Sequence, residues 1–203
     1  MEKLLVLGLN ELGLTPTQDQ IGKIQKLYQA LVRWNRLVNL TAVDDEAGFV
    51  TVHVLDSLAI YPYLQGPRIL DVGTGAGFPG LPLAIFFPQH HFVLLDAVAK
   101  KIRFVLQMVL ELELFNVEAV HARVERYAAP AGFNTIVTRA FAEAGRSFAL
   151  CHRLLAPGGK FLAMKGRYPE AERAALAALN PRIFPLQVPS LGAERHLIEI
   201  TQS

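Results

Sequence analysis

The sequence predicts an α/β fold: a largely parallel sheet with helices on both faces, preceded by a helical N-terminal segment. Three observations support this. Residues 66–203 alternate short apolar runs with segments of helical length, an order typical of parallel sheets with crossover helices. A glycine-rich turn follows the first of these runs. Residues 1–62 instead read as helices. We therefore expect a helical segment, residues 1–62, packed on a main domain, residues 63–203.

In the N-terminal segment, apolar residues at helical spacing predict a helix from Gln18 to Asn39, with Thr17 as its N-cap. Lys26, Arg33 and Arg36 fall within roughly an 80° arc opposite the apolar face. This arc is either a solvated helix face or a stripe that contacts phosphates. Both alternatives stay open from the sequence alone.

A second helix is expected from Asp45 to Ile60, since Pro62 stands just past its end. His53 and Ser57 are four residues apart on it and share a face, with Asp56 between them in the sequence. A histidine that packs between helices is the favoured interpretation of His53.

The main domain contains seven expected strands and four expected helices. The strands are Arg68–Val72, His91–Asp96, Val117–His121, Asn134–Arg139, Lys160–Lys165, Phe184–Pro189 and His196–Thr201. The helices are Gly80–Phe87, Ala99–Leu114, Glu143–Leu155 and Tyr168–Leu179. Because only Ser190–Arg195 separates the last two strands, at least one strand pair should be antiparallel.

Composition limits the class of protein. The 203 residues suit one domain with a small appendage, and 52% hydrophobic with 19% charged residues argue against disorder. No apolar run reaches the ~20 residues that span a bilayer, and the start lacks a signal-peptide cleavage site. The single cysteine, Cys151, excludes an intrachain disulfide and a cysteine-based zinc cluster. We expect a cytoplasmic protein that binds no membrane and no metal.

The segment Arg68–Gly80, RILDVGTGAGFPG, predicts a nucleotide-cofactor pocket. Gly73, Gly75 and Gly77 remove side chains where the backbone turns sharply and a ligand approaches. In a doubly wound sheet this crevice lies beyond the carboxyl ends of the strands. A turn of this kind alone fits NAD as well as S-adenosylmethionine.

Two carboxylates accompany the turn. Asp96 ends the second strand, where it can accept hydrogen bonds from a ribose diol of either cofactor, or else cap the next helix. Asp71 precedes the glycines, where it can serve the cofactor or brace the loop. Pro79 and Pro82 interrupt a dinucleotide fingerprint and favour S-adenosylmethionine.

The turn after the third strand should flank the adenine, with Val124 against the ring and Glu125 at its edge, unless it is an ordinary exposed loop.

The fourth strand ends in Thr138–Phe141, TRAF, where a methyl acceptor is expected. The Asp/Asn-Pro-Pro-aromatic runs of amino-methylating enzymes are missing, and Cys151 lies in an expected helix rather than after a strand. Acceptors that already present a lone pair remain, and guanine N7 is one. Such a transfer needs no general base, and we identify no catalytic side chain.

Three other classes of protein are alternatives to an RNA methyltransferase. A dinucleotide-dependent oxidoreductase would carry a tighter GxGxxG and a catalytic Tyr-Lys pair or His, which we do not find. A small-molecule methyltransferase would show an apolar lid over its pocket. A non-catalytic RNA-binding protein that retains a cofactor fold is the last alternative.

Six motifs in order, together with two N-terminal stretches, resemble the bacterial 16S rRNA guanine-N7 methyltransferases, the glucose-inhibited division protein B family. The motifs are DVGTGAGFPGLPLAI, LLDAVAKKIRFVLQ, ARVE, TRAF, MKG and GAERHLIEI, and the stretches are WNRLVNLTAV and HVLDSL. The resemblance implies a Rossmann-like, S-adenosylmethionine-dependent methyltransferase that modifies one guanine N7 of small-subunit ribosomal RNA. It carries cofactor-binding roles to Gly73, Phe78, Val124, Glu125 and Arg139.

The residues that would face the RNA are basic and lie near the carboxyl edge of the expected sheet. Lys100 opens the helix after Asp96, Lys165 ends the fifth strand, and Arg195 precedes the last strand. We expect these three side chains to contact phosphates of 16S rRNA or of the small ribosomal subunit. We expect the protein to act as a monomer.

Overall fold

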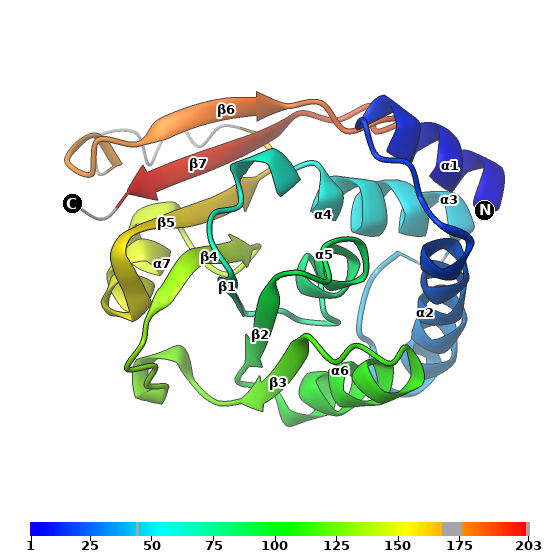
Figure 1. Cartoon of the computed structure of the whole chain (residues 1–203), viewed down its shortest axis with the longest axis horizontal. Helices are drawn as coiled ribbons and strands as arrows, with labels where there is room; N and C mark the ends of the chain where they lie inside the picture. Colours follow the sequence, from blue (N-terminus) through cyan, green and yellow to red (C-terminus); the bar gives the residue numbers. More distant parts are fainter. Residues whose placement is uncertain (44, 168–175, 202–203) are drawn as a thin grey trace.

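The computed structural model describes residues 1–43, 45–167 and 176–201, and in these ranges seven strands form one sheet (Figure 1). Their order across the sheet is β3-β2-β1-β4-β5-β7-β6. The bounds are β1 Arg68–Val72, β2 His91–Asp96, β3 Val117–His121, β4 Phe133–Arg139, β5 Leu155–Lys165, β6 Arg182–Leu186 and β7 Arg195–Thr201. Strands β1 to β5 pair in parallel, whereas β7 pairs antiparallel with both β5 and β6. The expected parallel sheet with an antiparallel end is confirmed.

Strands β4 and β7 each begin one residue earlier than predicted, and the bounds of β5 and β6 differ by more. Strand β5 begins at Leu155 rather than Lys160, because the chain pairs with Phe133 before a register shift. Strand β6 begins two residues earlier and ends three residues earlier than predicted, and it includes Pro185. A proline is tolerated there because β6 is an edge strand, and so its missing N–H breaks no central ladder.

The helices of the described residues fall into an N-terminal group and a group between the strands. The N-terminal group is α1 Glu2–Glu11, α2 Gln18–Val38, α3 Glu46–Gly48, the π-helix η1 Phe49–Leu55, α4 Asp56–Leu58 and the 3-10 turn η2 Tyr61–Tyr63. The second group is α5 Gly80–Phe86, α6 Ala99–Glu111, η3 Val124–Arg126, α7 Ala144–Cys151 and η4 His152–Leu154. The predicted helix Tyr168–Leu179 lies mostly outside the described residues.

Local sequence signals explain α2. Thr17 caps the helix, since its hydroxyl accepts from the Gln20 N–H while the Gln20 side chain accepts from the Thr17 N–H. Asn39 ends the helix with φ +49°. The N-cap predicted at Thr17 is confirmed.

The helix predicted from Asp45 to Ile60 forms, but its middle is wider than an α-helix. Residues Phe49–Leu55 adopt a π-helix, and the N–H of Asp56 bonds the carbonyl of Thr51, five residues back. Such turns are rare and are frequent at functional sites. The prediction that His53 and Ser57 share a face assumed a regular helix. In the structure the Ser57 hydroxyl donates to the His53 carbonyl, four residues back, so the two residues are in contact.

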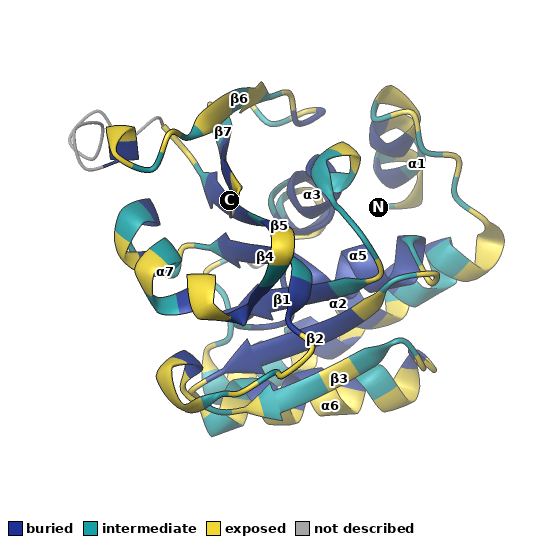
Figure 2. Ribbon diagram, turned by 60° about the vertical axis from the view of Figure 1, so that its left-hand side comes forward, coloured by how far each residue is buried: buried dark blue, intermediate teal, exposed yellow. Residues whose placement is uncertain are grey.

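The central strands are buried along almost their whole length (Figure 2), and their side chains divide between two clusters of the core. One cluster lies against α5, α6 and the N-terminal helices and contains strand residues such as Ile69 and Leu94. The other lies against α7 and contains their neighbours in sequence, such as Leu70 and Leu95. Because successive side chains of a strand point to opposite faces, one apolar strand supplies both clusters.

The N-terminal helices share the first of these clusters. Leu5 and Ile24 are fully buried in the same cluster as Phe104 of α6 and Leu94 of β2. One apolar core therefore runs from the N-terminal helices to the sheet, and a domain boundary near residue 62 stays a prediction. No described helix is both long and apolar enough to cross a membrane.

Candidate active site

The strand order places a crevice between the carboxyl ends of β1 and β4. The chain runs outward from β1 through β2 to β3 and then returns to β4 on the other side of β1. Neighbouring crossovers therefore leave the sheet in opposite directions at this point, where ligands of doubly wound sheets bind. The residues that end these strands are Val72 and Arg139.

The glycine turn after β1 needs its glycines for two different reasons. Gly73 has φ +72°, and a Cβ there would lie 2.6 Å from the ring of Phe141. Gly75 has φ +62°, but a Cβ there would have the Gly73 carbonyl oxygen, 4.0 Å away, as its nearest neighbour. One glycine thus permits close packing, and the other leaves open space beside the backbone.

Asp71 lies beneath this turn and holds it in place. Its Oδ2 accepts from the Thr74 hydroxyl at 2.6 Å and from the Gly80 N–H at 3.0 Å. Complete burial raises the pKa of Asp71 to about 6, against the opposing effect of these hydrogen bonds. Its Oδ1 is buried with no partner among the described residues. Asp71 lines neither of the two cavities described below, so the geometry favours the bracing alternative, and its cofactor role stays a prediction.

A first cavity of about 260 Å³ opens beside the turn. Its lining comes from the ends of β1 and β2, the turn after β3 and the segment after β4: Val72, Gly73, Leu95, Asp96, Ala97, Lys101, Ala122, Arg123, Val124, Glu125, Ala140 and Phe141. Four predicted cofactor residues, Gly73, Asp96, Val124 and Glu125, therefore meet in one cavity although they come from three separate parts of the chain.

Asp96 is 6% exposed in this cavity and already accepts two backbone hydrogen bonds. Its Oδ2 accepts from the Gly75 N–H at 3.0 Å, and its Oδ1 accepts from the Val98 N–H at 2.8 Å. The bond to Val98 lies in the loop before α6, and no side chain of the described residues caps the first turn of that helix, so the capping alternative is wrong. A carboxylate oxygen can accept a second hydrogen bond, so the same side chain can also receive a ribose diol. Lys101, 3.8 Å from Asp96 Oδ2, lines the cavity, whereas Lys100 is exposed outside it.

The turn that carries Val124 and Glu125 is fixed from outside the cavity. Arg153 donates to the carbonyls of Val124 and Tyr127. Val124 is 4% exposed, whereas Glu125 is exposed at the rim. A buried aliphatic face next to an exposed carboxylate suits the flat face and the polar edge of an adenine.

A second cavity of about 400 Å³ lies on the other side of the end of β4. It is lined by Val52, His53, Asp56, Arg139, Ala140, Met164, Lys165, Gly166 and Arg195. Ala140, with φ +51°, belongs to both linings. Lys165 donates from Nζ to the Ala142 carbonyl at 3.0 Å. Two of the predicted RNA-facing residues, Lys165 and Arg195, thus share a cavity that adjoins the first at a single residue.

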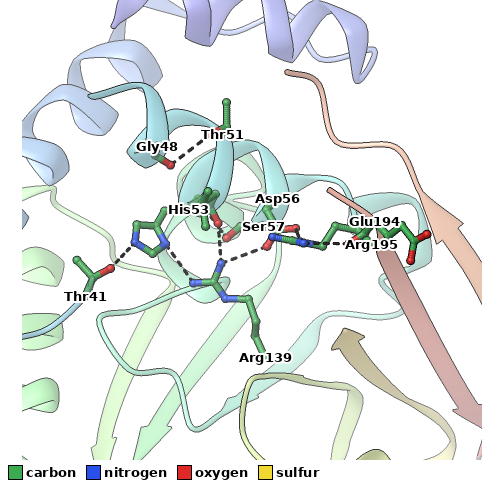
Figure 3. A network of polar contacts seen from close by, with 10 residues as sticks. Thr41, Gly48, Thr51, His53, Asp56, Ser57, Arg139, Glu194 and Arg195 are labelled. Carbon is green, nitrogen blue, oxygen red and sulfur yellow. Dashed lines mark hydrogen bonds and ion pairs between the residues drawn. The ribbon is translucent and has the colours of Figure 1, made fainter. Parts of the chain in front are cut away.

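Arg139 lies at the centre of a polar network in this cavity (Figure 3). Its Nη1 donates to the Val52 carbonyl at 2.9 Å and to Asp56 Oδ2 at 3.3 Å. Its Nη2 lies 3.4 Å from Nδ1 of His53. Asp56 is 3% exposed, and its Oδ1 accepts from Nε of Arg195 at 2.9 Å. One buried carboxylate therefore bridges two arginines.

The partners of His53 determine its form. Because a guanidinium can only donate, Nδ1 of His53 accepts from Arg139, and Nε2 then donates to Thr41 Oγ1 at 2.8 Å. Burial, with a smaller effect of the Arg139 charge, lowers the pKa of His53 to about 3. His53 is therefore a neutral imidazole at physiological pH.

Phe78 packs against His53 and Arg139 and does not line the second cavity. Its ring stacks on His53 with centroids 4.4 Å apart and planes 10° apart, and the guanidinium carbon of Arg139 lies 5.6 Å from the ring centroid. Phe78 is 3% exposed. Of the predicted cofactor residues, Arg139 thus lines the second cavity and Phe78 packs behind it, and the cofactor role of both stays a prediction.

Sequence reasoning underestimated His53 and Asp56. The prediction treated His53 as a packing histidine, and Asp56 appeared only as its neighbour. Their signal was the HVLDSL stretch, whose buried carboxylate and histidine have their partners about 83 and 86 residues away in sequence. No local pattern indicates a partner at that separation.

Comparison with known proteins agrees with this geometry. The model of the family described as GidB, rRNA small subunit methyltransferase G, matches residues 20–198. The chain belongs to the GidB family. A relative from Methylococcus capsulatus named "Ribosomal RNA small subunit methyltransferase G" is 47% identical over 97% of both chains. Relatives of the same name from Aeromonas salmonicida and Escherichia coli are 45% and 41% identical, over 94% and 97% of this chain and 93% and 96% of theirs.

Solved structures place this GidB chain among methyltransferase folds. A SAM-dependent methyltransferase from Aquifex aeolicus superposes with a TM-score of 0.61 at 18% identity, over 83% of this chain and 96% of that one. The N-methyltransferase NodS of Bradyrhizobium japonicum, solved with S-adenosyl-L-homocysteine, also gives a TM-score of 0.61 at 16% identity, over 87% and 98%. At these identities the likeness concerns the fold, which is the Rossmann-like architecture that the resemblance implied for the GidB chain.

Proposed function

We propose that the protein transfers a methyl group from S-adenosylmethionine to N7 of a guanine in small-subunit ribosomal RNA. The observation that carries the proposal is the pair of cavities that meet at Ala140, one lined by two carboxylates and two cations and the other by three cations and one carboxylate. A group-transfer enzyme needs two ligands side by side. The family membership of the chain supports the choice of reaction and of RNA.

The first cavity fits the cofactor by the chemistry of its lining. Asp96 offers acceptors to a ribose diol, Val124 an apolar face to an adenine, and Glu125 an acceptor at its edge. The open space at Gly75 lets the cofactor approach the backbone. When bound, the cofactor supplies a methyl group activated by the positive charge on its sulfur.

The second cavity fits an RNA nucleotide. Arg139, Lys165 and Arg195 bring three cations to it, against one carboxylate, Asp56. Such an excess of positive charge suits phosphate oxygens. A bidentate contact from arginine to guanine O6 and N7 is common in recognition, but here it would occupy the lone pair that must attack. The cations therefore position the nucleotide through other atoms.

Among the described residues that line the two cavities we assign no general base, which agrees with this acceptor. Guanine N7 carries a lone pair and no proton, and so attack on the methyl carbon requires no proton transfer from the protein. His53 is neutral, and both of its ring nitrogens are hydrogen-bonded to other side chains. It is therefore not needed as a base, because the attacking N7 has no proton to lose. In the part of the chain that the structure describes, no group of three or more His, Cys, Asp or Glu side chains could hold a metal ion. Catalysis then rests on positioning and electrostatics.

We also propose that the protein acts as a monomer in the cytoplasm, where its ribosomal substrate is found. Lys165 and Arg195 remain our RNA-contacting candidates, because both line the second cavity. Lys100 is a weaker candidate, because it lies outside both cavities.

The test uses ribosomal RNA and small subunits from a strain that lacks the protein, incubated with labelled S-adenosylmethionine. We expect label in the RNA, at a nucleotide that borohydride and aniline cleave as 7-methylguanosine. Label that resists this cleavage would contradict the N7 assignment. No label in RNA or subunits would contradict the proposed function and would favour the small-molecule or non-catalytic alternatives.

A further inference from the structure

The acceptor cavity contains a cation whose orientation depends on a different part of the chain. Arg139 ends β4, whereas Val52, His53 and Asp56 all come from the helical stretch that contains the π-helix. The side chain of Arg139 is 19% exposed. A buried guanidinium is normally fixed by acceptors on several sides, because unpaired polar groups are costly to bury.

The π-helix explains how this stretch offers three acceptors to one guanidinium. An α-helix would pair the Val52 carbonyl with the Asp56 N–H, but that N–H bonds Thr51 instead. The Val52 carbonyl accepts from Arg139, and the side chains of His53 and Asp56 accept from the same guanidinium. The wider turn thus directs one backbone and two side-chain acceptors at Arg139 (Figure 3).

The hydrogen-bond inventory shows what these contacts leave for a ligand. A guanidinium has five N–H groups. The contacts to Val52, Asp56 and His53 use both groups of Nη1 and one of Nη2. Among the described residues, the Nε–H and the second Nη2–H of Arg139 have no partner. These two donors remain for an acceptor in the cavity.

The second arginine makes a carboxylate necessary. Arg195 contacts the same Asp56, and its positive charge acts against that of Arg139. Without the carboxylate, two guanidinium groups would share a partly buried site and repel each other. Asp56 therefore sets both the spacing of the two cations and the direction of their donors.

We propose that Asp56 and His53 are positioning residues. They hold the Arg139 guanidinium in one orientation, so that its two remaining N–H groups donate to an acceptor of the substrate bound in this cavity. This inference rests on the proposed function and assigns a role to residues of the N-terminal helical stretch. Neither residue contacts the reacting atoms. Both act through Arg139.

The chain provides a matched control. Glu199 on β7 is also a buried carboxylate, 2% exposed, that bridges two cations, Lys160 at 3.1 Å and Arg182 at 3.2 Å. It lies four residues along β7 from Arg195 and lines neither cavity. Asp56→Asn and Glu199→Gln therefore remove equivalent buried charges, one at the acceptor cavity and one away from it.

The experiment measures methyl transfer to small-subunit RNA, binding of S-adenosyl-L-homocysteine and the thermal midpoint for each variant. We expect Asp56→Asn to lower kcat ~10- to 100-fold, since small misplacements of positioning groups cost this much. Glu199→Gln should lower the midpoint comparably and keep kcat within about threefold. In an Arg139→Gln background, Asp56→Asn should add less than about threefold, because its effect passes through Arg139.

A second pair of variants keeps the test valid if Asp56→Asn does not fold. His53→Gln retains an acceptor for Arg139, whereas His53→Leu does not, so His53→Gln should keep at least ~5-fold more activity. Full kcat in Asp56→Asn, an equal loss in Glu199→Gln, additive effects in the double variant or equal activity of the two His53 variants would overturn the inference. Lack of methyl transfer by the unmodified protein would instead overturn the proposed function.

Discussion

The two cavities differ in how the chain builds them. The first is formed largely by turns after β1, β2 and β3, and its charged lining residues, Asp96, Lys101, Arg123 and Glu125, lie in or next to those turns. The second is formed by side chains from the π-helix, β4, β5 and β7, whose charges neutralise one another in part. A turn is determined by a few consecutive residues, whereas a charge cluster depends on the whole fold. This difference agrees with our proposal that the first cavity binds the cofactor and the second binds the acceptor nucleotide.

The largest effect is expected from Gly73→Ala. Its Cβ would meet the Phe141 ring at 2.6 Å with φ at +72°, so the turn and the ring cannot both keep their places. We expect kcat/KM to fall ~100-fold through weaker cofactor binding, measured by titration with S-adenosyl-L-homocysteine. Gly145→Ala is the control, since a Cβ there meets nothing within 4 Å. Equal cofactor binding by both variants would show that the turn does not shape the first cavity.

Asp96→Asn should have the next largest effect. The amide keeps one acceptor for the backbone but loses the charge and one acceptor atom, so a hydrogen bond to a charged group is weakened. We expect cofactor affinity to fall ~10-fold and RNA affinity to stay the same. An unchanged cofactor affinity would leave Asp96 only the role of bracing the loops that contain Gly75 and Val98.

A smaller effect is expected from Lys165→Gln in the second cavity. Removal of one phosphate-contacting cation should weaken RNA binding a few-fold and reduce the slope of log K against log salt by about 1. Lys100→Gln, outside both cavities, serves as the comparison. A larger change in Lys100→Gln than in Lys165→Gln would move the RNA-binding surface away from the second cavity.

The smallest effect on stability at neutral pH is expected from His53→Gln. The unfolded histidine binds a proton below about pH 6.5, whereas the folded one, with a pKa near 3, does not. The unmodified protein therefore loses stability from this group as the pH falls from about 6.5 towards 3. Between pH 7 and 4.5 the variant should gain about 2.5 kcal/mol of stability relative to the unmodified protein. Denaturant unfolding curves whose difference does not change with pH would contradict the neutral, buried state of His53.

The sequence predicted the sheet and the first cavity well for a physical reason. Strands, crossover helices and the glycine turn depend on residues close in sequence, and Gly73, Asp96, Val124 and Glu125 follow strand ends that parallel pairing brings together. It predicted the second cavity only in part. Lys165 and Arg195 could be placed by the strands that they adjoin. The links from Arg139 to Asp56 and His53 depend on the packing of the N-terminal helices and on a π-helix with no clear sequence signal.

The assignment of the cofactor to the first cavity and of the RNA to the second is tested most directly by measuring the binding of both ligands to a variant of each cavity. Asp96→Asn and Arg195→Gln are each titrated with S-adenosyl-L-homocysteine and with a fragment of small-subunit ribosomal RNA. We expect Asp96→Asn to lose affinity for the cofactor product alone and Arg195→Gln to lose affinity for the RNA alone, because the two side chains line different cavities. Loss of the same ligand in both variants would contradict the account.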